Sequence, residues 1–416
     1  MPSAFEYGGT GSQPVAQVSN LCHVAQVFNL CCVAQVFNLC HVAPVSNRCH
    51  LSSRANQMDT RRFHKILFDA SRRLLPRESS ILCAVSGGPD SMAMLYALHR
   101  LNELRSLGWR LAVAHLDHHL PPNHSSDMAA LVREHASALG LPHVEDSVNV
   151  PSLAGATGES IEEAGRKARY AFLECAADQV GATFIAVAHH ADDQAETILH
   201  RIVRGTSLKG LAGIPERRRL SPERDDLFVV RPLLGVRRAD IVAYLDRRGI
   251  PSMHDATNDD TTVATRNLIR HELLPMIRQR VNPRIDSALV RLGRHARHAA
   301  DFISETADAA YRSAIACDGC EVLTLKVAAL SPLPKAVLGE VLLSALRDIG
   351  AVFKPLAAER IDAIASALAP NIERRTVQLP HGLMADRRGK YLYLKREAAP
   401  ESADPALSPG LEENLH

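Results

Sequence analysis

A short polar stretch, VSGGPDS at residues 85–91, brings together residue types that bind phosphate and metal. It follows an apolar run and precedes apolar residues at helical spacing. Adjacent glycines let backbone N–H groups approach an anion at a helix N-terminus, and Asp90 offers an oxygen ligand to the accompanying metal. The Walker motif GxxxxGK[ST] and the dinucleotide motif GxGxxG are both absent from this stretch. It therefore predicts a shorter phosphate loop, and the alternative is an ordinary glycine turn.

Alternating elements are needed to position this loop. The predicted strands are residues 81–85, 111–116, 144–150 and 183–188, and the predicted helices are residues 91–101, 127–139 and 159–180. This order favours a doubly wound, mostly parallel α/β sheet. Three of the strands end in the polar runs SGGPDS, HLDHH and HHADD. Since ligands bind beyond the carboxyl ends of parallel strands, we expect these runs to converge on one site.

Two further groups of charged residues are candidates for substrate contacts. Asp192, Asp193 and Glu196 form an acidic cluster at the start of a helix, where simple capping is the alternative explanation. A second group shares one face of the helix at 159–180, and its alternative is a solvated, salt-bridged face. Its members are Glu162, Arg166, Arg169 and Tyr170.

A one-sided basic strip lies between residues 266 and 297, with only Glu272 and Asp286 as acidic residues. Its arginines are Arg266, Arg270, Arg278, Arg280, Arg284, Arg291, Arg294 and Arg297. Such a strip suits salt-sensitive contacts with nucleic-acid phosphates, and the alternative is a solvated basic helix. The run at residues 217–219, RRR, is a candidate addition to the same surface.

Bulk properties exclude several classes of protein. The 416 residues are 46% hydrophobic with a net charge of +2, which suits a large folded core and gives no polyelectrolyte signal. No stretch approaches the roughly 20 apolar residues that cross a bilayer, so no membrane partner is expected. Of the nine cysteines, five lie before residue 58, which leaves too few for a disulfide framework and favours the cytoplasm. Cys317 and Cys320 form a lone CxxC, read as a tight turn or as a redox or metal pair.

The first 57 residues hold four copies of a nine-residue repeat, such as VAQVFNLCH. A β-solenoid or a metal site are possible readings of such a period, but four copies bury almost no core. We interpret the segment as disordered or as a nucleotide repeat translated in frame, with the functional start at Met58. A signal peptide fits poorly, because no basic region precedes the repeat.

The loop SGGPDS resembles the SGGxDS loop of ATP pyrophosphatases, which cleave ATP between its α and β phosphates. Further segments resemble bacterial tRNA(Ile)-lysidine synthetases over residues 58–394. They are HLDHHL, EEAGRKARYAFL, AHHADDQAETILHRIVRGTSLKGLAGI, RPLLGVRRADIVAYL and HDATNDDTTVATRNLIRHELLPMI. The sequence departs from the family helix at Gly165, where alanine is usual, and this costs the helix about 1 kcal/mol.

The resemblance implies a domain order. Residues 58–282 would form the adenylating PP-loop ATPase domain, and residues 283–397 a run of long helices to about residue 368 with a small tRNA-binding domain. That domain would end in a hairpin around residues 387–389. Residues 398–416 are acidic, contain proline and are expected to be disordered.

The resemblance also implies a reaction and its partners. ATP would activate the C2 carbonyl of the wobble cytidine in the CAU anticodon of isoleucine tRNA by adenylation, and L-lysine would displace AMP to give lysidine, with Mg²⁺ as the metal. Both a monomer and a homodimer are compatible with the sequence. The implied ATP-binding residues are Ser86, Gly87, Gly88, Pro89, Asp90 and Ser91, with Asp90 as the metal ligand. The implied catalytic residues are Asp90, Asp117, Asp193 and Arg204, and the implied substrate-binding residues are His118, Glu162, Arg166, Arg169, Asp192, Glu196, Arg266 and Arg270.

Three other functions share parts of this pattern. A tRNA thiolase of the same superfamily would carry sulfur on cysteines, and the core offers only Cys83 and Cys175. A glutamine-dependent ligase would need an ammonia-producing domain, for which we see no segment. An RNA-binding protein without catalysis explains the basic strip but leaves Asp90 beside the glycines without a role.

Overall fold

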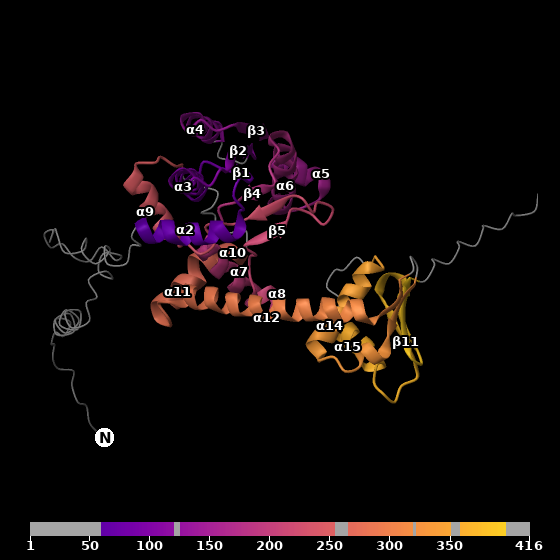
Figure 1. Ribbon diagram of the computed structural model, residues 1–416. Helices are drawn as coiled ribbons and strands as arrows, with labels where there is room; N and C mark the ends of the chain where they lie inside the picture. The colour runs from indigo at the N-terminus through magenta and orange to yellow at the C-terminus, as the bar shows by residue number, and fades with distance from the viewer. Residues whose placement is uncertain (1–59, 120–124, 254–264, 319–321, 351–357, 397–416) are drawn as a thin grey trace, which may run out of the picture. The chain divides into compact units, whose positions relative to one another are not determined.

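The computed structural model describes residues 60–119, 125–253, 265–318, 322–350 and 358–396 (Figure 1). The nine-residue repeat and the acidic tail lie outside these ranges, and so do Cys320 and part of the HDATNDDTTVATRN segment. Within the described ranges, no helix combines the length and the apolar character that crossing a membrane requires.

The first sheet has six strands in the order β3-β2-β1-β4-β6-β5. The strands are β1 Ser80–Ala84, β2 Arg110–Asp117, β3 His143–Ser147, β4 Phe184–Ala186, β5 Arg217–Arg219 and β6 Phe228–Val230. All neighbouring pairs are parallel except β5 with β6. The first strand, β1, lies at the centre of the sheet. The next two strands, β2 and β3, extend the sheet to one side, and β4 lies on the other side of β1. This arrangement confirms the predicted doubly wound, mostly parallel sheet.

Helices cover both faces of this sheet (Figure 1). On one face, Ile81 and Cys83 of β1 pack in a core with side chains from four helices. These helices are α2 Thr60–Leu74, α3 Pro89–Arg105, α4 Ser125–Ala138 and α9 Arg238–Arg248. On the other face, Leu82 packs with Leu173 and Ala177 of α6, Ile161–Val180. Because successive strand residues point to opposite faces, a continuous apolar strand supplies both cores.

Three helix starts define the loops at the carboxyl edge of the sheet. Gly88 precedes α3, whose first residue is Pro89, so Asp90 and Ser91 lie in the first turn. Ser160 caps α6 by accepting a hydrogen bond from the Glu163 N–H. His190 caps α7, Ala191–Val203, in a capping box with Asp193. The predicted helices after residues 91, 127 and 159 are therefore present, each with an end shifted by a few residues.

The remaining helices up to residue 314 were not all predicted. They are α5 Val150–Thr157, α8 Leu208–Leu211, α10 Thr265–Leu268, a π-helical turn η3 Ile269–Leu273, α11 Leu274–Arg280 and α12 Ile285–Ala314. A small core joins Ala195 and Ile198 of α7 to Ile269, Leu274 and Leu289. This core fixes α7 against the chain that carries the basic strip.

A second, antiparallel sheet follows α12, in the order β7-β8-β11-β10-β9. Its strands are β7 Ile315–Asp318, β8 Val322–Lys326, β9 Arg374–Leu379, β10 Leu383–Arg388 and β11 Tyr391–Arg396, and it packs with α13 Val327–Leu330, α14 Lys335–Asp348 and α15 Ala358–Ala367. A short 3₁₀ turn, η4 Pro380–Gly382, joins β9 to β10. The predicted hairpin at residues 387–389 is confirmed as β10 and β11. The prediction of long helices through to residue 368 was wrong at β7 and β8, where Leu323 and Leu325 alternate with more exposed residues in the period of a strand.

Candidate active site

The SGGPDS segment forms a tight loop between β1 and α3. Gly87 has a φ of +85°, a backbone conformation that side chains rarely adopt. The Ser91 hydroxyl accepts a hydrogen bond from the Ser86 N–H at 3.1 Å and donates one to the Gly88 carbonyl at 3.0 Å. These bonds close the loop over the first turn of α3. The N-terminus of α3 has no side-chain cap, so its N–H groups are available to an anion.

His115, the first residue of the HLDHH run, holds the start of this loop. His115 on β2 is 3% exposed, and its Nδ1 lies 2.8 Å from the Val85 carbonyl. Val85 is the first residue after β1, where the chain leaves the strand ladder. The imidazole therefore replaces a ladder partner at the point where the loop begins. The sequence placed His115 in the HLDHH run but did not assign it this contact.

A pocket of about 400 Å³ lies beside the loop. Its polar lining consists of Ser86, Asp90, Ser91, His118, Arg169, Tyr170 and His189, and its apolar lining includes Ala84, Leu116, Phe172, Leu173 and Val187. The polar runs after β1, β2 and β4 thus meet at one place, as the sheet order predicts. An apolar wall beside phosphate-binding backbone is suited to a nucleotide.

Asp90 and the start of α7 are joined through a buried histidine. His190 is 4% exposed, and its Nε2 lies 3.7 Å from Asp90 Oδ2 and 3.5 Å from Asp193 Oδ2. Burial raises the pKa of Asp90, and the opposing influence of His190 does not cancel that effect. Asp90 Oδ1 is buried without a hydrogen-bond partner among the described residues. An unpartnered carboxylate oxygen fits a cation, and Mg²⁺ commonly uses one or two carboxylates together with substrate phosphates and water.

Next to His190 is a cluster of two carboxylates and two arginines, here called the charged cluster: Asp193, Glu196, Arg266 and Arg270. Arg270 donates to both oxygens of Glu196, at 2.7 and 2.9 Å, and to Asp193 at 3.2 Å. Arg266 lies farther away, 3.6 Å from Glu196 and 3.9 Å from Asp193. Glu196 is 4% exposed and is held mainly by Arg270. Asp193 is 9% exposed and also accepts a hydrogen bond from the His190 N–H at 2.9 Å. The structure thereby joins two residues of the acidic run to two of the basic strip.

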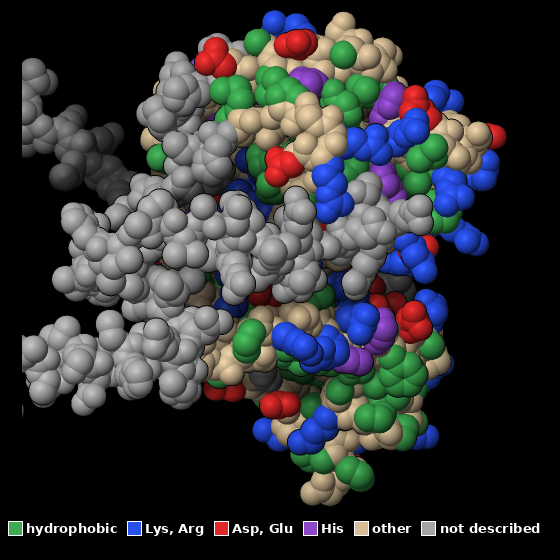
Figure 2. Space-filling view, turned by 90° about the vertical axis from the view of Figure 1, so that its left-hand side faces the viewer, with side chains coloured by type: hydrophobic (Ala, Val, Ile, Leu, Met, Phe, Trp, Pro, Cys, Tyr) green, Lys and Arg blue, Asp and Glu red, His purple; other side chains and the backbone are tan. Residues whose placement is uncertain are grey.

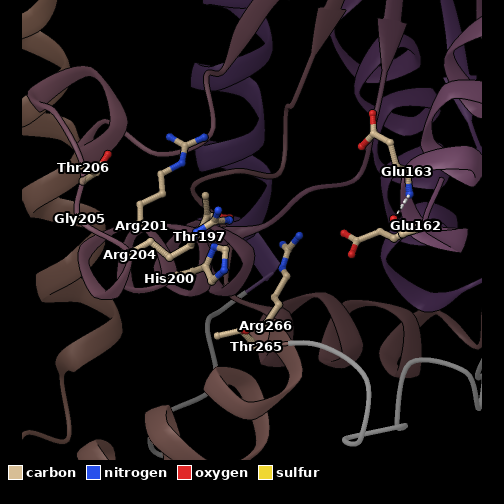
Figure 3. Close-up of a pocket in the computed structure, with 11 residues that line it drawn as sticks. Glu162, Glu163, Thr197, His200, Arg201, Arg204, Gly205, Thr206, Thr265 and Arg266 are labelled. Atoms are coloured by element: carbon tan, nitrogen blue, oxygen red, sulfur yellow. Dashed lines mark hydrogen bonds between the residues drawn. The ribbon is translucent and has the colours of Figure 1, made fainter. Parts of the chain in front are cut away.

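A second pocket, of about 790 Å³, opens beside the charged cluster. In Figure 3, Glu162 and Glu163 of α6 lie on one side, and His200 and Arg204 with Arg266 lie on the other. Arg204 ends α7 and is exposed. Acidic and basic walls that face one space suit a ligand carrying both charges, or a phosphate chain passing the arginines.

Three other predicted residues lie outside both pockets. The Asp117 carboxylate accepts from the His119 N–H at 2.8 Å, within the turn after β2. Asp192 accepts from the Arg238 N–H at 2.8 Å, at the start of α9. Arg166 lies over the Tyr170 ring, with Cζ 5.7 Å from the ring centroid. By contrast, the predicted residues His118 and Arg169 do line the nucleotide pocket, where Arg169 Nη2 is 3.3 Å from His118 Nε2.

The basic strip divides into internal and exposed arginines. Three arginines make internal contacts. Arg278 pairs with Asp286 at 2.7 Å, and Arg297 donates to the Ala212 carbonyl at 2.8 Å. Arg270 is paired within the charged cluster. The exposed members are Arg280, Arg284, Arg291 and Arg294. On the face in Figure 2, basic side chains are interspersed with acidic and hydrophobic ones. The phosphate contacts predicted for this strip would therefore involve its exposed members.

The RRR run packs on aromatic rings, and the CxxC segment is exposed at Cys317. Arg217 lies over the Phe228 ring at 3.8 Å, and Arg218 lies over the Tyr170 ring at 4.7 Å. The two arginines thus pack on aromatic rings. Cys317 is an exposed cysteine at the end of β7, and its predicted partner lies outside the described residues.

Two histidines near Asp90 or at the nucleotide pocket, His190 and His189, had no role assigned from the sequence. Both belong to the HHADD run, which placed them at the end of a strand but did not show which side chain would reach Asp90. His189 lines the pocket, and Arg231 donates to its Nδ1. The RPLL segment that contains Arg231 was part of the family resemblance only.

Known proteins resemble this chain over the same region. Residues 55–277 match the family ATP_bind_3, described as a PP-loop domain. The tRNA(Ile)-lysidine synthase of Thermotoga sp. (strain RQ2) is 38% identical over 53% of this chain and 50% of the relative. That of Dehalococcoides mccartyi is 41% identical over 52% and 46%. That of Parabacteroides distasonis is 32% identical over 82% of this chain and 72% of the relative. The chain thus spans about half the length of the first two relatives.

Proposed function

The chain belongs to the PP-loop family of tRNA(Ile)-lysidine synthases, and from this premise we propose that it makes lysidine in a tRNA. ATP adenylates the C2 oxygen of the wobble cytidine in the CAU anticodon of tRNA(Ile), releasing pyrophosphate. An amino nitrogen of L-lysine then attacks C2, and AMP leaves with that oxygen. The product cytidine would read AUA in place of AUG.

The observation that carries the proposal is the link from the phosphate loop to the charged cluster. His190 lies between Asp90 of the loop and Asp193 of the cluster, at 3.7 and 3.5 Å. A nucleotide held by the loop would therefore place its reacting phosphate near groups that bind ammonium and carboxylate. Holding ATP, a base and an amine together supplies much of the rate enhancement for a ligation of this kind.

The loop supports departure of pyrophosphate. Its backbone N–H groups and the Ser86 and Ser91 hydroxyls surround the N-terminus of α3, which favours negative charge. Asp90, with its unpartnered Oδ1, would hold Mg²⁺. When bound, that ion neutralises charge on the leaving phosphates. The roles of the loop residues rest on this local chemistry and on the family motif.

The charged cluster supports recognition of lysine. Its carboxylates, Asp193 and Glu196, are buried and shared with Arg270. An ammonium group entering beside them would gain two charge-assisted hydrogen bonds. Arg204, Arg266 and Glu162 border the adjoining pocket, where the remaining polar groups of lysine or a tRNA phosphate would be bound.

A thiolase reaction has less support. Burial raises the pKa of the Cys83 thiol to about 12, so this cysteine stays protonated near neutral pH. Cys175 is exposed and lies on α6, and it is not among the residues that line the nucleotide pocket.

The test uses the full chain with ATP, Mg²⁺, labelled lysine, and either tRNA(Ile) with a CAU anticodon or methionine tRNA, which has the same anticodon. We expect label in the isoleucine tRNA alone, with release of AMP and pyrophosphate. Asp90→Asn should abolish pyrophosphate release while leaving tRNA binding intact, and exposed Asp301→Asn on α12 is the matched control. Pyrophosphate release without label in tRNA would refute the lysine assignment, and normal turnover by Asp90→Asn would refute the metal role.

A further inference from the structure

His189 and Arg231 form a polar pair at the wall of the nucleotide pocket. His189 follows β4 and lines the pocket. Arg231 follows β6, the neighbouring strand, and is 4% exposed. The two side chains meet because β4 and β6 are adjacent in the sheet.

The contacts of Arg231 are unusual for a buried guanidinium. Its Nε donates to His189 Nδ1 at 3.3 Å, and its Nη1 donates to the Pro215 carbonyl at 2.8 Å. Within the described ranges, no carboxylate lies at ion-pair distance from it. Its other neighbours are Tyr170, whose side chain is also hydrogen-bonded to it, and the cations Arg218 and Arg166. A buried charge normally has an ionic partner, so its use as a donor to a neutral ring suggests a specific purpose.

The contact dictates where the proton of His189 lies. Arginine has donors and no acceptor, so a hydrogen bond between the two requires His189 Nδ1 to accept. A neutral imidazole that accepts at Nδ1 carries its hydrogen on Nε2. Burial is the main influence that lowers the pKa of His189, to about 4. Arg231 and other cations also lower this pKa, and Asp193 opposes them. The ring is therefore neutral at physiological pH.

We propose that Arg231 is a positioning residue that fixes His189 in the Nε2–H form, so that His189 donates a hydrogen bond to an anionic oxygen of the bound nucleotide. This inference rests on the proposed function only in taking ATP as the pocket's ligand. A neutral donor orients a phosphate oxygen without adding a full positive charge beside the electrophilic phosphorus. The positive charge of Arg231 also opposes protonation of the ring, which maintains this state.

Two substitutions of His189 distinguish the ring nitrogens. The amide nitrogen of glutamine reaches the position of Nε2, and that of asparagine reaches the position of Nδ1. Measured by ATP binding to the full chain without tRNA or lysine, His189→Asn should raise the Kd about tenfold or more, and His189→Gln about threefold at most. The reverse order would overturn the proposal.

A double-mutant cycle tests the part played by Arg231. Arg231→Gln should raise the ATP Kd about tenfold in the wild-type background and have little further effect beside His189→Gln, because an amide has no tautomer to fix. Exposed Arg72→Gln on α2 is the matched control. Additive effects of the two substitutions would overturn the positioning role.

A spectroscopic measurement on the unaltered chain avoids any dependence on variant folding. Nitrogen-15 chemical shifts of labelled histidine report the tautomer, and the signal missing from His189→Gln identifies His189. We expect the Nε2–H form in wild type and a mixture in Arg231→Gln. The Nδ1–H form in wild type would overturn the proposal. These experiments need neither lysine nor tRNA, so failed lysidine synthesis with these results intact would refute the proposed function alone.

Discussion

Removing the Arg270 guanidinium tests whether the charged cluster holds the domain together. Arg270 makes three hydrogen bonds to Glu196 and Asp193, and the side chains of these acids are 5% and 12% exposed. The two carboxylates raise the pKa of Arg270 despite the opposing effect of its burial. Arg270→Gln would therefore leave two buried negative charges with Arg266 as the nearest remaining arginine of the cluster, at 3.6 and 3.9 Å.

The expected loss follows from the degree of burial. Breaking a buried ion pair by removing one partner costs about 3–5 kcal/mol. The Arg270 side chain is 25% exposed and Arg266 remains nearby, so we expect the lower end, about 3 kcal/mol. For a domain of this size, such a loss lowers the melting temperature by about 6–12 °C.

The assay is thermal unfolding of wild type, Arg270→Gln, Glu196→Gln and the double variant, with Arg72→Gln as the control. Glu196→Gln removes one of the buried negative charges that Arg270→Gln leaves unpaired. The free energy of unfolding of the double variant should therefore be about 1–2 kcal/mol higher than the sum of the two single losses predicts. A shift below about 2 °C for Arg270→Gln, or strictly additive losses, would refute this account of the cluster.

Three smaller predictions concern single positions. Gly213→Ala should destabilise by about 2 kcal/mol or more in thermal unfolding, because φ is +66° and the added Cβ would lie 2.8 Å from Gln194 Cδ; an unchanged melting temperature would contradict the clash. Gly165→Ala should stabilise α6 by up to about 1 kcal/mol, because its Cβ would meet Val150 at ordinary contact distances of 3.4 and 3.7 Å; a loss of stability would show that α5 cannot yield. Burial alone would raise the pKa of Asp386, but hydrogen bonds from Thr376 and Arg388 outweigh it and lower that pKa. Its contribution to stability should be full above about pH 4 and lost as pH falls through the lowered value, so urea unfolding of wild type and Asp386→Asn should converge in acid.

Much of the fold could be predicted because it depends on local patterns. Apolar runs ending in polar tails indicated β1, β2 and β4, and their alternation with helices indicated a parallel sheet. The helix predicted over residues 159–180 corresponds to α6, which begins at Ile161 after its cap Ser160. The strands β7 and β8 were missed because helix-forming alanines surround them, and the alternation over Val322–Lys326 is only five residues long.

The motifs of the site could be predicted from the sequence more readily than the contacts between its side chains. The loop at residues 86–91 and the HHADD run were recognisable from residue types. The contacts of His115 and Arg231 were not, since both residues bond to residues distant in the sequence. The basic strip was read as one surface, but Arg278 and Arg297 point into internal contacts, which depend on how α11 and α12 pack.

The sequence by itself determined the phosphate loop, the alternation of the first four strands with helices, and the edge of the sheet at which the polar runs meet. These follow from residue type and periodicity, which act over a few neighbouring positions. The tertiary structure decided which polar side chains face one another: Asp90 with His190, Asp193 with Arg270, and His189 with Arg231. Such pairs join residues 42 to 100 positions apart, and packing of whole elements brings them within a few ångströms, which is beyond the range of any local pattern.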